Sequence, residues 1–230
     1  MTSWHESPAA FDLETTGIDV RSAKIVSASL VRLDRTGAVI QQRDWLVDPG
    51  EAIPAQATAV HGITTERVQA EGVPARLAIP EIVAAVREVL DAGIALVVYN
   101  APYDLSLLAW EARRHGAGAM ERLAPIVDPI IVDKQVDRYR KGKRTLELTA
   151  SHYGVPLDGA HDAAVDAIAA ARVAQAIGRQ YAAQLPTNAQ ELHDAQLGWA
   201  AAQQADFAAY MRRQVDPNWV SDRPAWPGGV

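Results

Sequence analysis

The chain has 230 residues, which is enough for one domain of ordinary size with an extension but short for two full domains. Hydrophobic residues make up 49% of it and charged residues 22%, a balance typical of globular proteins that excludes a disordered or fibrous chain. The formal net charge of −6 argues against a protein that coats nucleic acid through a broad cationic surface. A local nucleic-acid site stays open, because bound metal ions would reverse the sign of a carboxylate cluster.

The sequence contains no cysteine, so any metal ion must bind oxygen or imidazole ligands. Residues 1–10 lack the basic stretch and apolar run of a secretory signal, and no window approaches the roughly 20 apolar residues that cross a bilayer. We therefore expect a cytoplasmic protein that does not bind membranes.

Along the chain, strand patterns come first and helical patterns enter later. Runs of apolar and small residues bounded by turn residues predict strands over 9–14, 24–33, 39–47, 95–99 and 126–132. Apolar residues at helical spacing predict helices over 79–90, 103–115, 144–153 and 162–183. This order predicts an α/β domain over residues 1–186, with a mixed five-stranded sheet flanked by helices.

From residue 187 to residue 230 the character of the chain changes. A helical stretch with Leu192, Trp199 and Tyr210 on one stripe gives way to a segment punctuated by Trp and Pro. We interpret 187–230 as a C-terminal helical extension that covers the domain's own surface. The alternative is that its helix docks on another protein or on a second copy of the chain.

Two acidic residues of the first predicted strand share one face. Asp12 and Glu14 lie two apart, so their side chains leave the same side of the strand while Phe11 and Leu13 turn into the core. Carboxylates fixed in this way suit hard cations such as Mg²⁺ or Mn²⁺. A surface strand with two solvated acids is the competing interpretation, because an Asp-x-Glu pair alone is a weak signal.

Two further acidic positions are ambiguous from pattern alone. Asp104 follows the predicted strand 95–99 at the start of a helix, where an acid also complements the helix dipole. In the last cluster, helical geometry places Asp162 and Asp166 on one face, whereas His161 and Asp166 diverge by about 140°. His161 can join the same site only from outside the regular helix, which Gly159 just before it allows.

Taken together, these segments resemble the three motifs of the DEDDh 3′-to-5′ exonuclease family, which includes the proofreading epsilon subunit of bacterial DNA polymerase III. The matching segments, in order, are Phe11-Asp12-Leu13-Glu14-Thr15-Thr16-Gly17, Tyr99-Asn100-Ala101-Pro102-Tyr103-Asp104 and His161-Asp162-Ala163-Ala164-Val165-Asp166-Ala167. Val127-Asp128-Pro129 and Arg144-Thr145-Leu146-Glu147-Leu148 resemble the connection into the last motif. The resemblance selects Asp166 over Asp162 as the ligand. One departure is Tyr99, where many relatives carry histidine.

The resemblance implies a ribonuclease-H-like fold and a hydrolase that releases nucleoside 5′-monophosphates from a DNA 3′ end, single-stranded or frayed, in proofreading or repair. Two Mg²⁺ or Mn²⁺ ions would be held by Asp12, Glu14, Asp104 and Asp166, with His161 as the general base. Leu13 and Thr15 would receive the terminal 3′-hydroxyl through their backbone. His61, Ile63 and Asn100 would line the pocket for the last nucleotide.

A basic run stands out in the acidic chain just before the third motif. Its cations are Arg138, Arg140, Lys141, Lys143 and Arg144, with Tyr139 among them. Charge runs are usually solvated loops, but cations with an aromatic residue beside a phosphate site suit single-stranded nucleic acid. We expect Lys143 and Arg144 to contact substrate phosphates.

Three alternatives stay open at this stage. The same chemistry could act on RNA or short oligonucleotides, since one fold serves both. The chain could also be a non-catalytic module that binds a polymerase, although every acidic position and the histidine are filled. Finally, the extension could attach the chain to a polymerase subunit or to a second copy.

Overall fold

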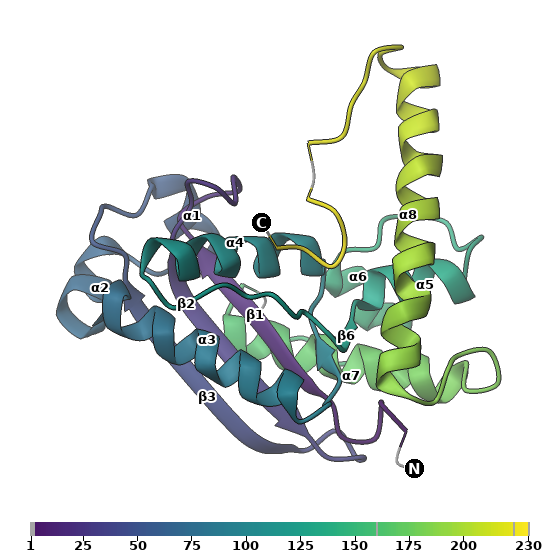
Figure 1. The fold of residues 1–230 in the computed structure, drawn as a ribbon, viewed down its shortest axis with the longest axis horizontal. Helices are drawn as coiled ribbons and strands as arrows, with labels where there is room; N and C mark the ends of the chain where they lie inside the picture. Colours follow the sequence, from purple (N-terminus) through teal and green to yellow (C-terminus); the bar gives the residue numbers. More distant parts are fainter. Residues whose placement is uncertain (1–2, 160, 223, 230) are drawn as a thin grey trace.

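The computed structural model describes residues 3–159, 161–222 and 224–229 (Figure 1). The strands are β1 (Ala9–Thr15), β2 (Ile25–Leu33), β3 (Val39–Asp48), β4 (Val73–Pro74), β5 (Leu96–Val97) and β6 (Ile126–Val127). The helices are α1 (Ala55–His61), α2 (Thr65–Glu71), α3 (Ala75–Asp91), α4 (Ala101–Arg114), α5 (Pro129–Val136), α6 (Leu146–His152), α7 (Ala163–Gln180) and α8 (Ala189–Gln214). Within the described ranges, no helix is long and apolar enough to cross a membrane.

The strands form one mixed sheet in the order β4-β3-β2-β1-β5-β6. β1 pairs antiparallel with β2 and parallel with β5, so the two halves of the sheet meet along β1. The predicted mixed α/β architecture is confirmed, but the sheet has six strands and not five. The additional strand, β4, has only two residues, one of them proline, and is too short for any periodicity to reveal it.

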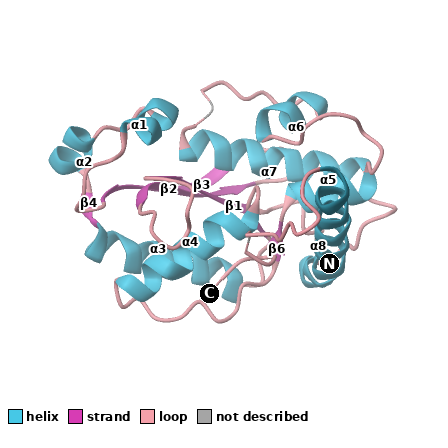
Figure 2. Ribbon diagram, turned by 90° about the horizontal axis from the view of Figure 1, so that it is seen from above, coloured by secondary structure: helices cyan, strands magenta, loops and turns pink. Residues whose placement is uncertain are grey.

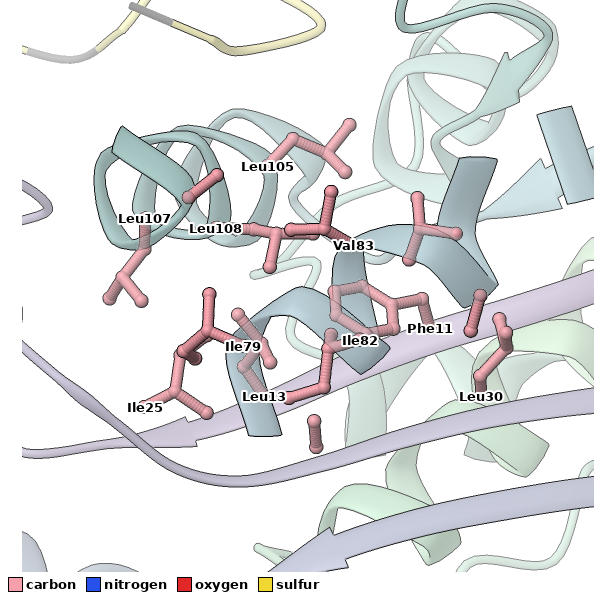
Figure 3. Packing of buried hydrophobic residues seen from close by; sticks show 14 of the residues in the cluster. Phe11, Leu13, Ile25, Leu30, Ile79, Ile82, Val83, Leu105, Leu107 and Leu108 are labelled. Atoms are coloured by element: carbon pink, nitrogen blue, oxygen red, sulfur yellow. The ribbon is translucent and has the colours of Figure 1, made fainter. Parts of the chain in front are cut away.

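Helices cover both faces of the sheet (Figure 2). α3 and α4 lie on one face, and α6 and α7 lie on the other. The side-chain alternation of β1 serves both layers: Phe11 and Leu13 pack with α3 and α4 (Figure 3), while Ala10 packs in the cluster that includes α7. Asp12 and Glu14 alternate with Phe11 and Leu13, so their side chains point toward the face that α7 covers.

Two segments differ from the sequence prediction. The predicted strand 126–132 is a strand only at Ile126–Val127, and a helix begins at Pro129. Asp128 causes the switch, because its side chain accepts a hydrogen bond from the backbone N–H of Ile130 and proline favours the first helical position. The segment before His61, for which no helix or strand is predicted, contains the short helix α1.

The base of α8 seals the outer edge of the sheet. Nδ1 of His193 accepts from the backbone N–H of Ile126 at 3.1 Å. The Gln196 amide donates to the Ile126 carbonyl at 3.0 Å and accepts from the Asp128 N–H at 2.8 Å. These side chains stand where a further strand would pair, so part of segment 187–230 is built into the domain. The distal part of α8 projects away from the body (Figure 1).

Candidate active site

The acidic residues of β1 and α7 converge at the carboxyl end of β1. Asp12, Glu14 and Asp166 each offer a carboxylate oxygen, and these oxygens all lie within 4.8 Å of one another. Asp12 and Glu14 point to the α7 face because their neighbours Phe11 and Leu13 are buried on the opposite face. The structure thus brings together three of the four predicted acidic ligands in one close group.

Asp104 reaches the same site from the first turn of α4. It is buried, and its charge acts on Asp12, although it does not belong to the group within 4.8 Å. A hydrogen bond from the backbone of Leu13 to Asp104 links the α4 carboxyl group to β1. All four predicted acidic residues therefore belong to one cluster.

The cluster is strained electrostatically. Burial raises the pKa of Asp12 well above its usual range, and the charges of Asp104 and Asp166 raise it further. Burial, followed by the charges of Asp166 and Asp162, raises the pKa of Glu14 to about 7. The pKa values of Asp104 and Asp166 are also raised, mainly by burial. Like charges this close favour a positively charged ligand.

His161 lies outside the regular helix, as the sequence required. Its backbone is left-handed, with φ of 69°, and its N–H donates to Oδ2 of Asp166 at 3.1 Å. Asp162 is the N-cap of α7 and accepts from the N–H groups of Ala164 and Val165. Asp162 is thus engaged as a helix cap, and Asp166 faces the cluster.

His61, which is predicted to line the nucleotide pocket, lies at the end of α1. Its Nδ1 accepts from the backbone N–H of Ile63 at 3.1 Å, so the neutral ring carries its proton on Nε2. Nε2 is buried and makes no hydrogen bond of good geometry with any described residue, and the Thr15 backbone is the group that interacts with the ring. Burial lowers the pKa of His61, opposed by the Thr15 backbone and assisted by the His161 charge. Ile63 packs with Val26 and leaves only 8% of its surface exposed, so it mainly anchors this loop.

Tyr103 organises the end of β1 and was not identified as a site residue from the sequence. Its hydroxyl lies 2.6 Å from Oγ1 of Thr15 and donates to the Gly17 carbonyl at 2.5 Å. Burial raises the pKa of Tyr103 to about 12, so the hydroxyl keeps its proton. The backbone around Thr15, where a substrate hydroxyl is expected, is held by this contact.

Asp128 is a second residue whose role the sequence left open. Its carboxylate accepts from the backbone N–H groups of Asn100 (3.2 Å) and Ala101 (3.1 Å). Asn100 is the N-cap of α4 and has a left-handed backbone, with φ of 65°. The buried carboxylate of Asp128 therefore holds the turn that presents both Asn100 and Asp104. The sequence signal for Asp128 was its position directly before Pro129, because an aspartate followed by proline is typical of the start of a helix.

The cations of the basic run have different environments. Arg140 and Arg144 both bind Asp133, which is fully buried, and Nε of Arg144 lies 2.5 Å from it. Arg138 lies 3.7 Å from Asp206 on the surface. The Arg144 guanidinium is paired with Asp133, and Arg144 also lines a cavity beside Asn100, so its phosphate contact stays a prediction. Lys143 is exposed and lines the same cavity.

The residues present fit divalent cations. The donors are carboxylate oxygens, which Mg²⁺ and Mn²⁺ prefer. Oδ1 of Asp166 is buried and accepts no hydrogen bond from any described residue, so it is available to a ligand.

Comparison with known proteins decides the family. A family model described as exonuclease, of the RNase T type, matches residues 9–174, which include the acidic cluster and His161. The chain belongs to this exonuclease family. It is thus a member of the DEDD exonucleases, which depend on divalent metal ions, and the resemblance found in the sequence is confirmed.

Several curated proteins are similar to this exonuclease. A DNA polymerase III PolC-type protein of Pediococcus pentosaceus is 28% identical over 156 residues, which are 68% of this chain and 10% of that protein. A DNA polymerase III subunit epsilon-like protein of Rhodobacter capsulatus is 32% identical over 70% of this chain and 22% of that protein. The exonuclease chain thus spans a minor part of the length of these relatives.

Solved structures share the fold. E. coli exonuclease I in complex with a dA16 oligonucleotide superposes with a TM-score of 0.63 at 16% identity, over 88% of this chain and 45% of that chain. Exonuclease X in complex with 5′ overhanging duplex DNA gives a TM-score of 0.56 at 20% identity, over 80% of this chain and 96% of that chain. The ribonuclease-H-like architecture is therefore confirmed for this family member.

Proposed function

We propose that the protein is a 3′-to-5′ exonuclease that hydrolyses single-stranded or frayed DNA and releases nucleoside 5′-monophosphates. The observation that carries the proposal is the meeting of Asp12, Glu14 and Asp166 within 4.8 Å, with Asp104 and His161 beside them. A scaffold that needs only a stable fold gains nothing from gathering buried and half-buried carboxylates whose pKa values are all raised.

Each residue has a distinct task in this proposal. Asp12, Glu14, Asp104 and Asp166 would hold two divalent cations, Mg²⁺ or Mn²⁺. Cations bound there supply positive charge for the phosphorane-like transition state and make an attacking water more acidic. His161 accepts a proton from that water. The hydrogen bond from the His161 backbone N–H to Asp166 holds His161 beside the cluster.

The terminal nucleotide contacts the end of β1 and the segments that contain His61 and Asn100. The backbone at Leu13 and Thr15, steadied by Tyr103, binds the terminal 3′-hydroxyl. The Nε2–H of His61 can donate to the last nucleotide, whose pocket Asn100 and the Ile63 loop complete.

DNA is favoured over RNA as the substrate on the comparisons, because relatives are named as DNA polymerases and the exonuclease I structures hold deoxyoligonucleotides. The same relatives motivate a role in replication or repair, with a polymerase subunit as partner. The alternatives are an exoribonuclease of the same fold and a non-catalytic module bound to a polymerase.

The test compares substrates in parallel. Purified protein is incubated with single-stranded DNA, duplex DNA carrying a mismatched 3′ end, and RNA of the same sequence, each with Mg²⁺ or Mn²⁺. We expect both DNA substrates to yield 5′-mononucleotides faster than RNA. Faster RNA turnover would select the exoribonuclease, and no turnover of any substrate would select the non-catalytic module.

A further inference from the structure

A cavity of about 570 Å³ lies beside the active site, between α5 and the loop that leads into α6. We call it the basic groove and define it by its lining residues, which include Asn100, Ile130, Lys134, Lys143, Arg144 and Leu146. Asn100 is the N-cap of α4, and Asp104 follows it one helical turn later. The groove therefore borders the helical turn that carries Asp104.

Buried ion pairs attach the loop between α5 and α6, which lines the groove, to Asp133 of α5. Asp133 binds Arg140 and Arg144 and also accepts from the Tyr153 hydroxyl at 2.7 Å. The Arg144 guanidinium donates in addition to the Asp137 carbonyl at 2.5 Å. Both arginines thus fix the loop, and Arg144 also lines the groove. Lys143, which lies between them in the sequence, is exposed.

The chemistry of the groove suits a nucleotide unit. Lys134 and Lys143 are exposed and line it from α5 and from the loop, whereas Ile130 and Leu146 contribute partly exposed apolar surface. Ammonium groups bind backbone phosphate, and apolar surface accepts the face of a base or sugar. This local cationic character contrasts with the net charge of −6 of the whole chain.

We propose that the basic groove is a second subsite for a single-stranded polynucleotide. It binds the nucleotide upstream of the scissile bond, with Lys134 and Lys143 on its phosphate, and so makes the enzyme prefer chains over mononucleotide esters. The inference rests on the proposed function, because Asn100 would then contact the terminal nucleotide on one side and border the upstream nucleotide on the other. Continuity through Asn100 and charge complementarity carry it.

The first test measures binding without turnover. An oligothymidylate is titrated in Ca²⁺ against the Asp12→Asn protein, alone and with Lys134→Ala, Lys143→Ala or both, over a range of salt. Each single-strand phosphate contact contributes about 0.7 to the slope of log affinity against log salt, so we expect the slope to fall by about 0.7 per lysine and about 1.4 for the pair. Lys141→Ala is the matched control, since Lys141 is exposed in the same loop but does not line the groove.

The second test measures turnover on two substrates. The p-nitrophenyl ester of thymidine 5′-monophosphate has the scissile bond but no upstream nucleotide. We expect the lysine substitutions to lower the ratio of kcat/KM for the oligonucleotide to that for the ester, by about tenfold or more for the pair. An unchanged slope and ratio in the double variant, or an equal effect of Lys141→Ala, would overturn the groove assignment. Absence of turnover of both substrates by the unmodified protein would instead overturn the proposed function, while the binding titration still decides the groove.

Discussion

Glu14 is the residue at which the electrostatics of the site can be measured most directly. It is 8% exposed, and the charges that act on it most are those of two other carboxyl groups, with no lysine or arginine among them. Burial and the charges of Asp166 and Asp162 raise its pKa to about 7. In the absence of metal, folding therefore makes this carboxyl group a weaker acid.

The sign of the pH dependence follows from this shift. A carboxyl group whose pKa rises on folding binds its proton more tightly in the folded state, so stability falls as pH rises from the ordinary value of 4.5 through about 7. We predict that the Tm of metal-free protein decreases over this range and that Glu14→Gln reduces the decrease. Thermal melts across pH measure it, with Glu51→Gln, an exposed acid outside the cluster, as the control. Identical pH profiles for Glu14→Gln and the unmodified protein would refute the prediction.

The sequence predicted the β1 ligands from elementary geometry but could not place the third motif in the same way. The period of two put Asp12 and Glu14 on one face, which the structure bears out. Counting helical faces favoured Asp162 with Asp166, because the count assumed that the helix already includes residue 162. Asp162 instead has an extended backbone and caps α7, and His161 before it is left-handed. Only the family resemblance selected Asp166 with His161.

At the scale of elements, the ion pairs of Asp133 stabilise the connection between α5 and α6. Asp133 is fully buried, and its partners Arg140 and Arg144 are 12% and 10% exposed at their side chains. The sequence showed these arginines as part of a charge run, because nothing in the pattern distinguishes a cation that faces solvent from one that turns inward. The pairing depends on tertiary contacts between residues seven and eleven positions apart.

Removing Asp133 should therefore affect folding. Asp133→Ala leaves two largely buried guanidinium groups without their carboxylate, and breaking a buried pair in this way costs about 3 to 5 kcal/mol. We predict a loss of this size in the free energy of unfolding, measured by urea denaturation. Asp206→Ala breaks the exposed pair with Arg138 and should change stability little. Equal stability of the two variants would show that the Asp133 network is not structural.

At the scale of the whole molecule, the segment after residue 186 completes the sheet. Leu192 is fully buried in the cluster that contains Ala10 and α7, and Gln196 substitutes for a strand at the β6 edge. A helical stripe was visible in the sequence, but a buried glutamine that pairs with a strand edge has no periodic signature. The C-terminal residues also return to α4, where the N–H of Gly229 donates to the Ser106 hydroxyl at 3.0 Å.

This arrangement predicts that α8 contributes to the stability of the domain. Gln196→Met removes the bonds to Ile126 and Asp128 and leaves buried backbone groups unsatisfied, which costs about 1 to 3 kcal/mol for each group. We predict a lower midpoint of urea denaturation for this variant. Gln204→Met, at an exposed position of the same helix, should leave the midpoint unchanged. A Gln196→Met midpoint equal to that of the control would mean that the edge contact is dispensable.

Digestion of end-labelled DNA shows whether the carboxylate cluster around Asp166 removes nucleotides from the 3′ end of a strand. Single-stranded DNA labelled at either end is digested in Mg²⁺ by the unmodified protein, by Asp166→Asn and by Asp162→Asn, which keeps a good helix cap. We predict that the 3′ label is released at once as a mononucleotide and that the 5′ label stays on progressively shorter strands. Asp162→Asn should behave like the unmodified protein, whereas Asp166→Asn should release nothing. Immediate release of the 5′ label, or undiminished activity of Asp166→Asn, would show that this cluster is not a 3′-to-5′ exonuclease site.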